Sequence, residues 1–265
     1  MQSALTIPRD LDYAIFVRRI REKTGVDLSC YKRPQMERRL WALAQESGAR
    51  SFAEFARMLE TSPDLLEAFR RRFTINVSEL FRDPQKFHEL ETRILPELLA
   101  QTARPRVWSA GCSYGAEAYS LAILLHERLG PAGAYVLATD IDEEMLERAR
   151  EGVFSAADLQ HVSAVRQRRW FTAEARGYRV RPELRRAVRF QRHDLLSDRF
   201  EKGFHLILCR NVVIYFTDEA KARLYRAFWE SLVPGGVLFV GATERIFEAR
   251  EIGFEQISPF FYRRT

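Results

Sequence analysis

Apolar residues recur three and four positions apart along the first third of the chain. YAIFVRRI (13–20) and FAEFARMLE (52–60) have this spacing, and no alternating strand pattern interrupts residues 10 to about 91. Ser62-Pro63 and Asp83-Pro84 each place a capping residue before a proline, which is typical of a helix start. The pattern predicts an all-helical N-terminal domain over residues 1–90.

After ARPR (103–106), short apolar stretches alternate with helical patterns. The helical patterns cover about 116–129, 143–150 and 218–232, and the expected strands are RVWSA (106–110), AYVLATD (134–140), VRFQRHD (188–194), FHLILCRN (204–211) and GVLFVGA (236–242). This alternation predicts an α/β domain over residues 91–265, with a parallel sheet, right-handed crossovers and helices on both faces. EQISPFFYRR (255–264) reads as one terminal strand, antiparallel at or near an edge.

One segment breaks the alternation. YRVRPELRRAVRFQRH (178–193) suggests two short strands joined by a tight turn near residues 182–186. We expect a small hairpin appended to the main sheet, within a β subdomain of about 170–193, with its arginines facing solvent.

The charge of the chain is unevenly distributed. The formal net charge is +6, residues 166–192 hold ten arginines against two acids, and residues 18–39 hold eight basic residues against three acidic ones. This local excess of basic residues predicts an acidic partner, which could be nucleic acid, anionic lipid or an acidic protein surface. The alternative is that each basic patch is simply a solvated surface. No apolar run approaches the roughly 20 residues of a membrane span, and residues 1–10 lack a secretory signal pattern, so we expect a cytoplasmic protein without membrane insertion.

A glycine turn joins the first expected strand to the next helix. In VWSAGCSYGAEAYSLAILL (107–125), Gly111 and Gly115 are spaced G-x-x-x-G. This differs from the dinucleotide pattern G-x-G-x-x-G and lacks the Lys-Ser/Thr pair of a phosphate loop. Bare N–H groups at a helix start without phosphate contacts favour a nucleoside with a short amino-acid tail, of which S-adenosylmethionine is the common example.

Two acids close the next strands. Asp140 ends AYVLATD, where a carboxylate can accept both ribose hydroxyls, and Asp194 ends VRFQRHD, where an acceptor can take an adenine amino group. The alternatives are a helix N-cap for Asp140, although Asp142 can cap that helix instead, and a turn residue for Asp194.

Five ordered blocks resemble the CheR-type chemotaxis receptor methyltransferases across nearly the whole chain. They are FTINVSELFRDPQKF (73–87), WSAGCSYGAEAYSLAILL (108–125), ATDIDEEMLERAREGVF (138–154), CRNVVIYF (209–216) and LVPGGVLFVGATE (232–244). The resemblance implies a class I, Rossmann-like S-adenosylmethionine-dependent methyltransferase sheet with an appended β hairpin and an N-terminal all-α domain. It also implies methyl transfer to glutamate side chains of methyl-accepting chemotaxis receptors, giving glutamyl methyl esters and S-adenosylhomocysteine.

The resemblance also assigns site residues. The cofactor contacts that it implies are Asn76, Ser78, Arg82, Gly111, Glu117, Asp140, Asp194, Leu195, Arg210 and Asn211. Arg82 would contact the cofactor carboxylate or the incoming glutamate, and Tyr215 would act at the reacting centre; the alternatives are a helix-surface arginine and a core tyrosine. The chain departs from the family pattern in GAEAYS for GEEPYS, in Ser78 for Thr, in Asp194 for a frequent Asn and in GATE for GHSE.

The expected reaction needs no general base, because a glutamate with a pKa of about 4.3 is already ionised at neutral pH. We expect the acidic receptor helices to dock on Arg33, Arg38 and Arg39, and the enzyme to be a monomer without a metal or nucleic acid. The resemblance implies that members tethered to a receptor pentapeptide carry a longer glycine-bearing loop at the appended hairpin. Here FTAEARGYRVR (171–181) is short and has only Gly177, so we expect a member that does not need the tether. The rival hypotheses are a methyltransferase acting on another acidic substrate such as RNA and a cofactor-binding regulator without catalysis.

Overall fold

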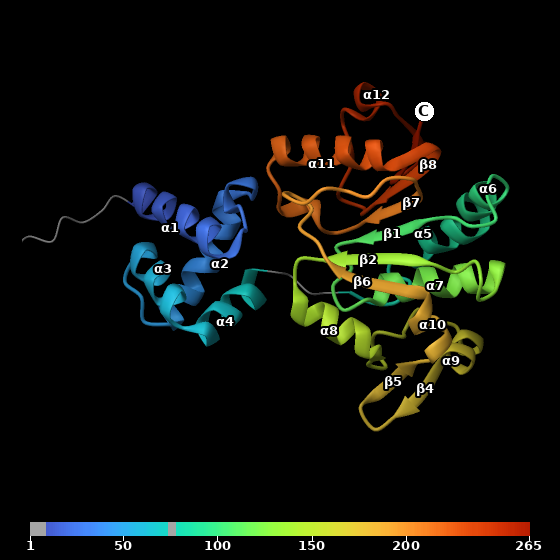
Figure 1. Cartoon of the computed structure of the whole chain (residues 1–265), viewed down its shortest axis with the longest axis horizontal. Helices are drawn as coiled ribbons and strands as arrows, with labels where there is room; N and C mark the ends of the chain where they lie inside the picture. Colours follow the sequence, from blue (N-terminus) through green and yellow to red (C-terminus); the bar gives the residue numbers. More distant parts are fainter. Residues whose placement is uncertain (1–8, 74–77) are drawn as a thin grey trace, which may run out of the picture. The chain divides into compact units, whose positions relative to one another are not determined.

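The structure, a computed structural model, describes residues 9–73 and 78–265 (Figure 1). It divides into two compact units, which we call the helical unit (Met1–Ile75 with Tyr215–Lys221) and the sheet unit (Asn76–Ile214 with Ala222–Thr265). The sequence pattern placed the boundary between the domains at residue 90. The structure divides earlier in the chain, because Leu80, Phe87 and Leu90 belong to the core of the sheet unit.

The helical unit is built on aromatic packing. Its helices are α1 (Arg9–Thr24), α2 (Arg33–Glu46), α3 (Phe52–Thr61) and α4 (Pro63–Phe73), with a short 3₁₀ helix at Leu28–Cys30. Phe16 of α1 packs against Phe52 and Phe55 of α3, with ring centroids 5.0 and 5.6 Å apart. The buried Asp12 accepts hydrogen bonds from the N–H groups of Phe52 and Ala53, so α1 caps the start of α3. The predicted N-terminal all-α domain is confirmed.

The sheet unit contains a seven-stranded sheet of order β6-β2-β1-β7-β8-β10-β9 (Figure 1). Its strands are β1 (Val107–Ala110), β2 (Val136–Asp140), β6 (Val188–Arg192), β7 (Phe204–Cys209), β8 (Leu232–Val240), β9 (Phe254–Ser258) and β10 (Phe261–Arg264). The pairs β6-β2, β2-β1, β1-β7 and β7-β8 are parallel, which confirms the α/β fold class. The C-terminal segment forms two antiparallel strands instead of one, because the chain reverses at Phe260, which has φ +76°.

Helices cover both faces of this sheet. Val107 contributes to a core shared with α7 (Ala116–Leu129), whereas Trp108 points to the opposite face, where its ring centroid lies 5.5 Å from that of Phe228 in α11 (Asp218–Ser231). The remaining helices of the unit are α5 (Pro84–Glu89), a π-helical turn (Leu90–Ile94), α6 (Leu95–Leu99), α8 (Glu143–Glu151), α9 (Ala164–Trp170), α10 (Pro182–Ala187), a 3₁₀ helix at Val213–Tyr215 that runs into the helical unit, and α12 (Ala249–Ile252). Alternating side chains on each strand thus give the sheet two buried faces.

The predicted hairpin at 178–193 is wrong. Helix α10 occupies the expected turn, because Pro182 starts a helix whose Leu184 and Ala187 are buried, and β6 joins the main sheet. The appended sheet has the order β3-β5-β4, formed by Val153–Phe154, Gly177–Val180 and Phe171–Glu174. Its hairpin therefore lies earlier in the chain.

The arginines of segment 166–192 have different environments. Arg166 is largely buried and pairs with Glu91 and Glu127 at 2.6 and 2.7 Å. Arg185 and Arg186 are exposed, as expected. Across residues 9–73 and 78–265, none of the helices has both the length and the apolar character needed to cross a bilayer.

Candidate functional site

The sheet order changes direction between β1 and β7. From β1 the chain places β2 and β6 on one side, and it places β7 and β8 on the other. Open parallel sheets bind ligands outside the carboxyl ends of the strands at such a switch point. The loops after β1, β2, β6 and β7 are therefore the candidate site.

The glycine turn after β1 is fixed by protein atoms. Gly111 and Gly115 have φ of +82° and +86°, a region that strongly favours glycine. A Cβ at Gly111 would lie 2.4 Å from Cγ2 of Val212, and one at Gly115 would lie 2.9 Å from Cβ of Ala149. The sequence interpretation attributed the bare turn to close approach of a ligand, whereas the structure shows that neighbouring side chains already require it.

Asp140 lies at the carboxyl end of β2 and faces this turn. Its carboxylate accepts a hydrogen bond from the N–H of Ser113 at 2.7 Å and from that of Asp142 at 3.0 Å. Asp142, and not Asp140, caps α8 by accepting from the N–H of Met145. Burial raises the pKa of Asp140 to about 6, although these amides partly oppose the shift. The side chain is thus a half-buried acceptor directed at the turn.

Asp194 follows β6 at the same edge of the sheet. It is buried, and its carboxylate accepts from the N–H of Leu196 at 2.9 Å, while its own N–H donates to Asp198. Within the protein, Asp194 therefore makes the hydrogen bonds of a turn residue, which was the alternative interpretation of the sequence. Leu195 is half-buried beside it. The main chain keeps this edge next to β2, because the N–H of His193 donates to the carbonyl of Asp140.

Glu117 and Arg210 form a buried ion pair between α7 and the end of β7. The Glu117 carboxylate accepts from the Ser109 hydroxyl at 2.7 Å and from Nη1 of Arg210 at 3.2 Å. Burial raises the pKa of Glu117, and the charges of Arg210 and Arg82 oppose the shift. Arg210 is buried on the face of Phe239, with its guanidinium carbon 4.6 Å from the ring centroid. A buried acid and base are thus held together beside the glycine turn.

Asp83 completes this charge cluster. The predicted helix start at Asp83-Pro84 is confirmed, because Asp83 is the N-cap residue of α5, but at φ +59° its side chain makes no cap bond. Its carboxylate accepts from Nη2 of Arg210, which also donates to the carbonyl of Arg82 at 3.0 Å. Strong pairing with a buried guanidinium is why the carboxylate turns away from the helix start.

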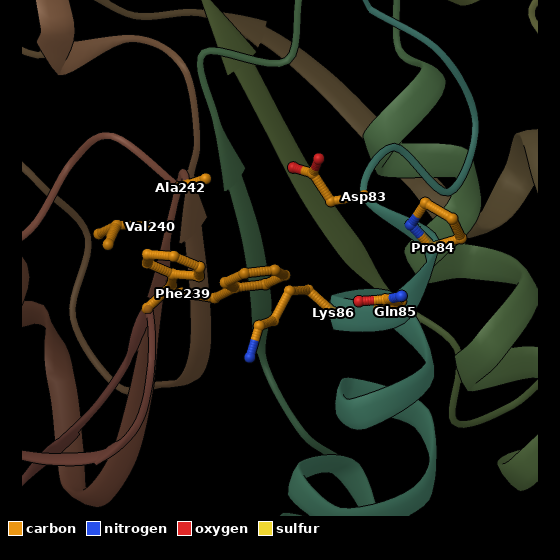
Figure 2. Close-up of a pocket in the computed structure, with 8 residues that line it drawn as sticks. Asp83, Pro84, Gln85, Lys86, Phe239, Val240 and Ala242 are labelled. Atoms are coloured by element: carbon orange, nitrogen blue, oxygen red, sulfur yellow. The ribbon is translucent and has the colours of Figure 1, made fainter.

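A cavity of about 360 Å³ opens beside Asp83, and Figure 2 shows the Asp83 carboxyl group directed across it toward Ala242. Its walls come from the start of α5, the end of β8 and the turn between β9 and β10. They consist of Asp83, Pro84, Gln85, Lys86, Phe239, Val240, Ala242 and Phe260.

The first block of predicted site residues is described in part. Asn76 lies outside the described residues. The carbonyl of Ser78 accepts from the Tyr114 hydroxyl, and Arg82 is half-buried, with its positive charge acting on Glu117. Asn211 follows Arg210 with φ +61°, a conformation in which asparagine is enriched.

The sequence prediction omitted Glu244, which is only 3% exposed. Its carboxylate accepts from the N–H groups of Asn211, Val213 and Gly241 at 2.7, 2.9 and 2.7 Å. The available signal was an acidic residue two positions after the apolar strand GVLFVGA. Such an acid needs partners if it is buried.

The remaining predicted residues belong to the helical unit. The carbonyl of Tyr215 accepts a hydrogen bond from the N–H of Lys32 at 2.8 Å, which holds Tyr215 in this unit. Burial lowers the pKa of the half-buried Arg39, and the Tyr215 side chain partly opposes this shift. On α2, Arg33 pairs with Asp10 and Glu37, whereas Arg38 is exposed. The three predicted docking arginines thus differ in how far their charge is already neutralised.

Two family models match the chain in succession. The model described as "CheR methyltransferase, all-alpha domain" matches residues 11–74, and the one described as "CheR methyltransferase, SAM binding domain" matches residues 76–259. Together they span both units.

Three named relatives are similar over nearly their whole lengths. The "Chemotaxis protein methyltransferase" of Listeria innocua is 40% identical over 96% of this chain and 97% of its own, and that of Listeria monocytogenes has the same values. The protein of the same name from Klebsiella aerogenes is 35% identical over 92% of this chain and 84% of its own. The chain therefore belongs to the CheR methyltransferase family and is an S-adenosylmethionine-dependent methyltransferase of chemotaxis.

Proposed function

We propose that this enzyme transfers methyl groups to glutamate side chains of methyl-accepting chemotaxis receptors, giving glutamyl methyl esters. The observation that carries the proposal is the occurrence of the Asp140 acceptor and of the Glu117–Arg210 ion pair at the ends of neighbouring strands at the switch point, in a chain whose relatives are named chemotaxis methyltransferases. Cytoplasmic location, a monomeric state and independence of a receptor pentapeptide belong to the same proposal.

The residues at the switch point fit S-adenosylmethionine. A carboxylate offers about four acceptor positions, and the two amides that bind Asp140 leave capacity for both ribose hydroxyls. Nε of Arg210 is buried without a hydrogen-bond partner among the described residues, which suits a site that gains an acceptor on binding. We assign the ribose to Asp140 and the adenine amino group to Asp194 with Leu195. The amino-acid part is assigned to Gly111, Glu117, Arg210, Asn211 and the first block, namely Asn76, Ser78 and Arg82.

When bound, S-adenosylmethionine supplies an electrophilic methyl group. A receptor glutamate is already ionised at neutral pH, so the protein need not remove a proton. Its task is to place the carboxylate in line and to exclude water, which otherwise solvates the charge. We assign Arg82 to the cofactor carboxylate or the incoming glutamate and Tyr215 to the reacting centre, and both assignments rest on the sequence resemblance.

We expect Arg82→Ala and Tyr215→Phe each to reduce kcat for methyl transfer by roughly tenfold or more, the effect of losing one oriented hydrogen bond to a charged group. Both side chains are only partly buried, so the fold should remain intact. Steady-state kinetics with purified receptor, together with thermal melting, checks this. Wild-type turnover in either variant would remove that residue from the mechanism.

The arginines of α2 predict a dependence on salt. Receptor methylation regions are acidic, so steering by the exposed Arg38 and the half-buried Arg39 should make kcat/KM fall roughly tenfold between 50 mM and 500 mM salt. Arg38→Gln should flatten this dependence, whereas Arg33→Gln should change it little, because Asp10 and Glu37 already neutralise Arg33. Activity that is equal at low and high salt would argue against docking on this face.

Transfer of a radiolabelled methyl group to receptor-bearing membranes tests the function directly. We expect a label that is released by mild alkali, as a carboxylic ester is. Alkali-stable label on RNA would support the first rival hypothesis. Cofactor binding without any transfer would support a regulator, the second.

A further inference from the structure

Glu244 joins two loops that leave the carboxyl edge of the sheet. One oxygen of its carboxylate accepts from Val213, and the other accepts from both Asn211 and Gly241. Asn211 and Val213 follow β7, whereas Gly241 follows β8. Parallel strands stop pairing where they end, so these N–H groups need another acceptor, and the Glu244 carboxylate supplies it. Glu244 lies in a turn that is closed by a hydrogen bond from its own N–H to the carbonyl of Gly241.

The carboxylate lies close against the main chain of Gly241. A Cβ on Gly241 would lie 2.4 Å from Oε2 of Glu244 and 3.0 Å from the N–H nitrogen of Asn211. Glycine is therefore required at the end of β8 for the carboxylate to reach the loop after β7. Burial raises the pKa of Glu244, and the amide bonds from Asn211, Gly241 and Val213 counteract the shift.

This loop is in contact with the candidate cofactor site on two sides. Val212, between the two bonded amides, lies against Gly111, where an added Cβ would come within 2.4 Å of its Cγ2. Arg210, directly before the loop, binds Glu117 and Asp83. On the β8 side, the turn carries Ala242, a wall of the cavity beside Asp83 (Figure 2).

We infer that Glu244 is a positioning residue for methyl transfer: its carboxylate fixes the loop 210–213 against the glycine turn and so sets the cofactor-binding geometry. The inference rests on the proposed assignment of Gly111, Arg210 and Asn211 to the cofactor. Glu244 itself contacts neither the cofactor nor the substrate. Its action is to hold Asn211 at φ +61° and Val212 in place.

Glu244→Gln tests this with a side chain of nearly the same size. The amide offers one oxygen, and its NH₂ group must face either the Val213 N–H or the N–H groups of Asn211 and Gly241. We expect S-adenosylhomocysteine to bind roughly tenfold more weakly, because the lost bond leaves the loop in its binding geometry in only about a tenth of the molecules. Amide hydrogen exchange of Asn211, Val213 and Gly241 should accelerate by a similar factor while the central strands keep their protection.

The control is Glu248→Gln, four residues further along the chain. Glu248 is exposed and makes no side-chain cap bond, so this variant should leave both cofactor affinity and amide exchange unchanged. A purely structural role for Glu244 would lower the melting temperature but leave the affinity of the folded enzyme within twofold of wild type, and that result would overturn the inference. Unchanged amide exchange would overturn it as well. Failure of the wild-type enzyme to methylate receptors would instead refute the proposed function, since neither measurement involves a receptor.

Discussion

Asp140→Ala is expected to weaken binding of S-adenosylhomocysteine by about a hundredfold or more. On the proposed assignment, the variant loses two hydrogen bonds from ribose hydroxyls to an ionised carboxylate. Each such bond contributes about 1.5–3 kcal/mol, and about 1.4 kcal/mol corresponds to a tenfold change in affinity. Isothermal titration calorimetry measures the effect directly.

The same carboxylate predicts how binding depends on pH. Because burial raises the pKa of Asp140 to about 6, the side chain is an ionised acceptor above that pH and becomes protonated below it. Affinity should be constant above about pH 7 and fall by up to roughly tenfold per pH unit below 6. The stability of the free enzyme should respond to Asp140 in the opposite sense: a raised native pKa means that the folded state binds more protons between about pH 4 and 6, so protonation stabilises it.

Asp140→Asn separates Asp140 from two other acids of the sheet unit, Glu117 and Glu244, whose pKa values are also raised by burial. The difference in pH dependence between wild type and this variant belongs to Asp140. If the variant binds S-adenosylhomocysteine as tightly as wild type, and with the same pH profile, Asp140 does not hold the ribose.

The α/β architecture could be predicted because its signals are local. Each strand of the parallel sheet is a short apolar run, and the turn at Gly111 and Gly115 needs positive φ at both positions. Asp140 could be found in the same way, since an acid that ends a strand must lie at the carboxyl edge. For the strands, the glycine turn and Asp140, position along the chain is therefore enough to predict position in the fold.

Other features depend on partners that are distant in sequence. Helix α10 was predicted as a turn because PELRRA is too short to show a helical period, and only burial of Leu184 and Ala187 reveals it. Asp83 looks like a helix cap until Arg210, 127 positions later, takes its carboxylate. Glu244 binds main-chain N–H groups, which every residue possesses, so no side-chain pattern marks its partners.

The pair formed by Glu117 and Arg210 gives the second large effect. In Arg210→Met, Glu117 loses its buried counter-charge, and breaking such a pair costs about 3–5 kcal/mol of the free energy of unfolding. Burial already raises the pKa of Glu117, and losing the opposing charge of Arg210 should raise it further. Urea unfolding checks the loss, and calorimetry should show that S-adenosylhomocysteine binding is lost with it.

The double variant Arg210→Met/Glu117→Gln separates stability from binding. Two neutral side chains of similar volume remove the uncompensated charge, so most of the lost unfolding free energy should return. Binding should not return, because neither methionine nor glutamine supplies a charged group to the amino-acid part of the cofactor. A double variant as unstable as the single one would show that Arg210 stabilises the fold through Asp83 and the Arg82 carbonyl instead. If binding returned together with stability, the two residues would serve only to hold β7 against α7, and the assignment of this charge pair to the cofactor would fail.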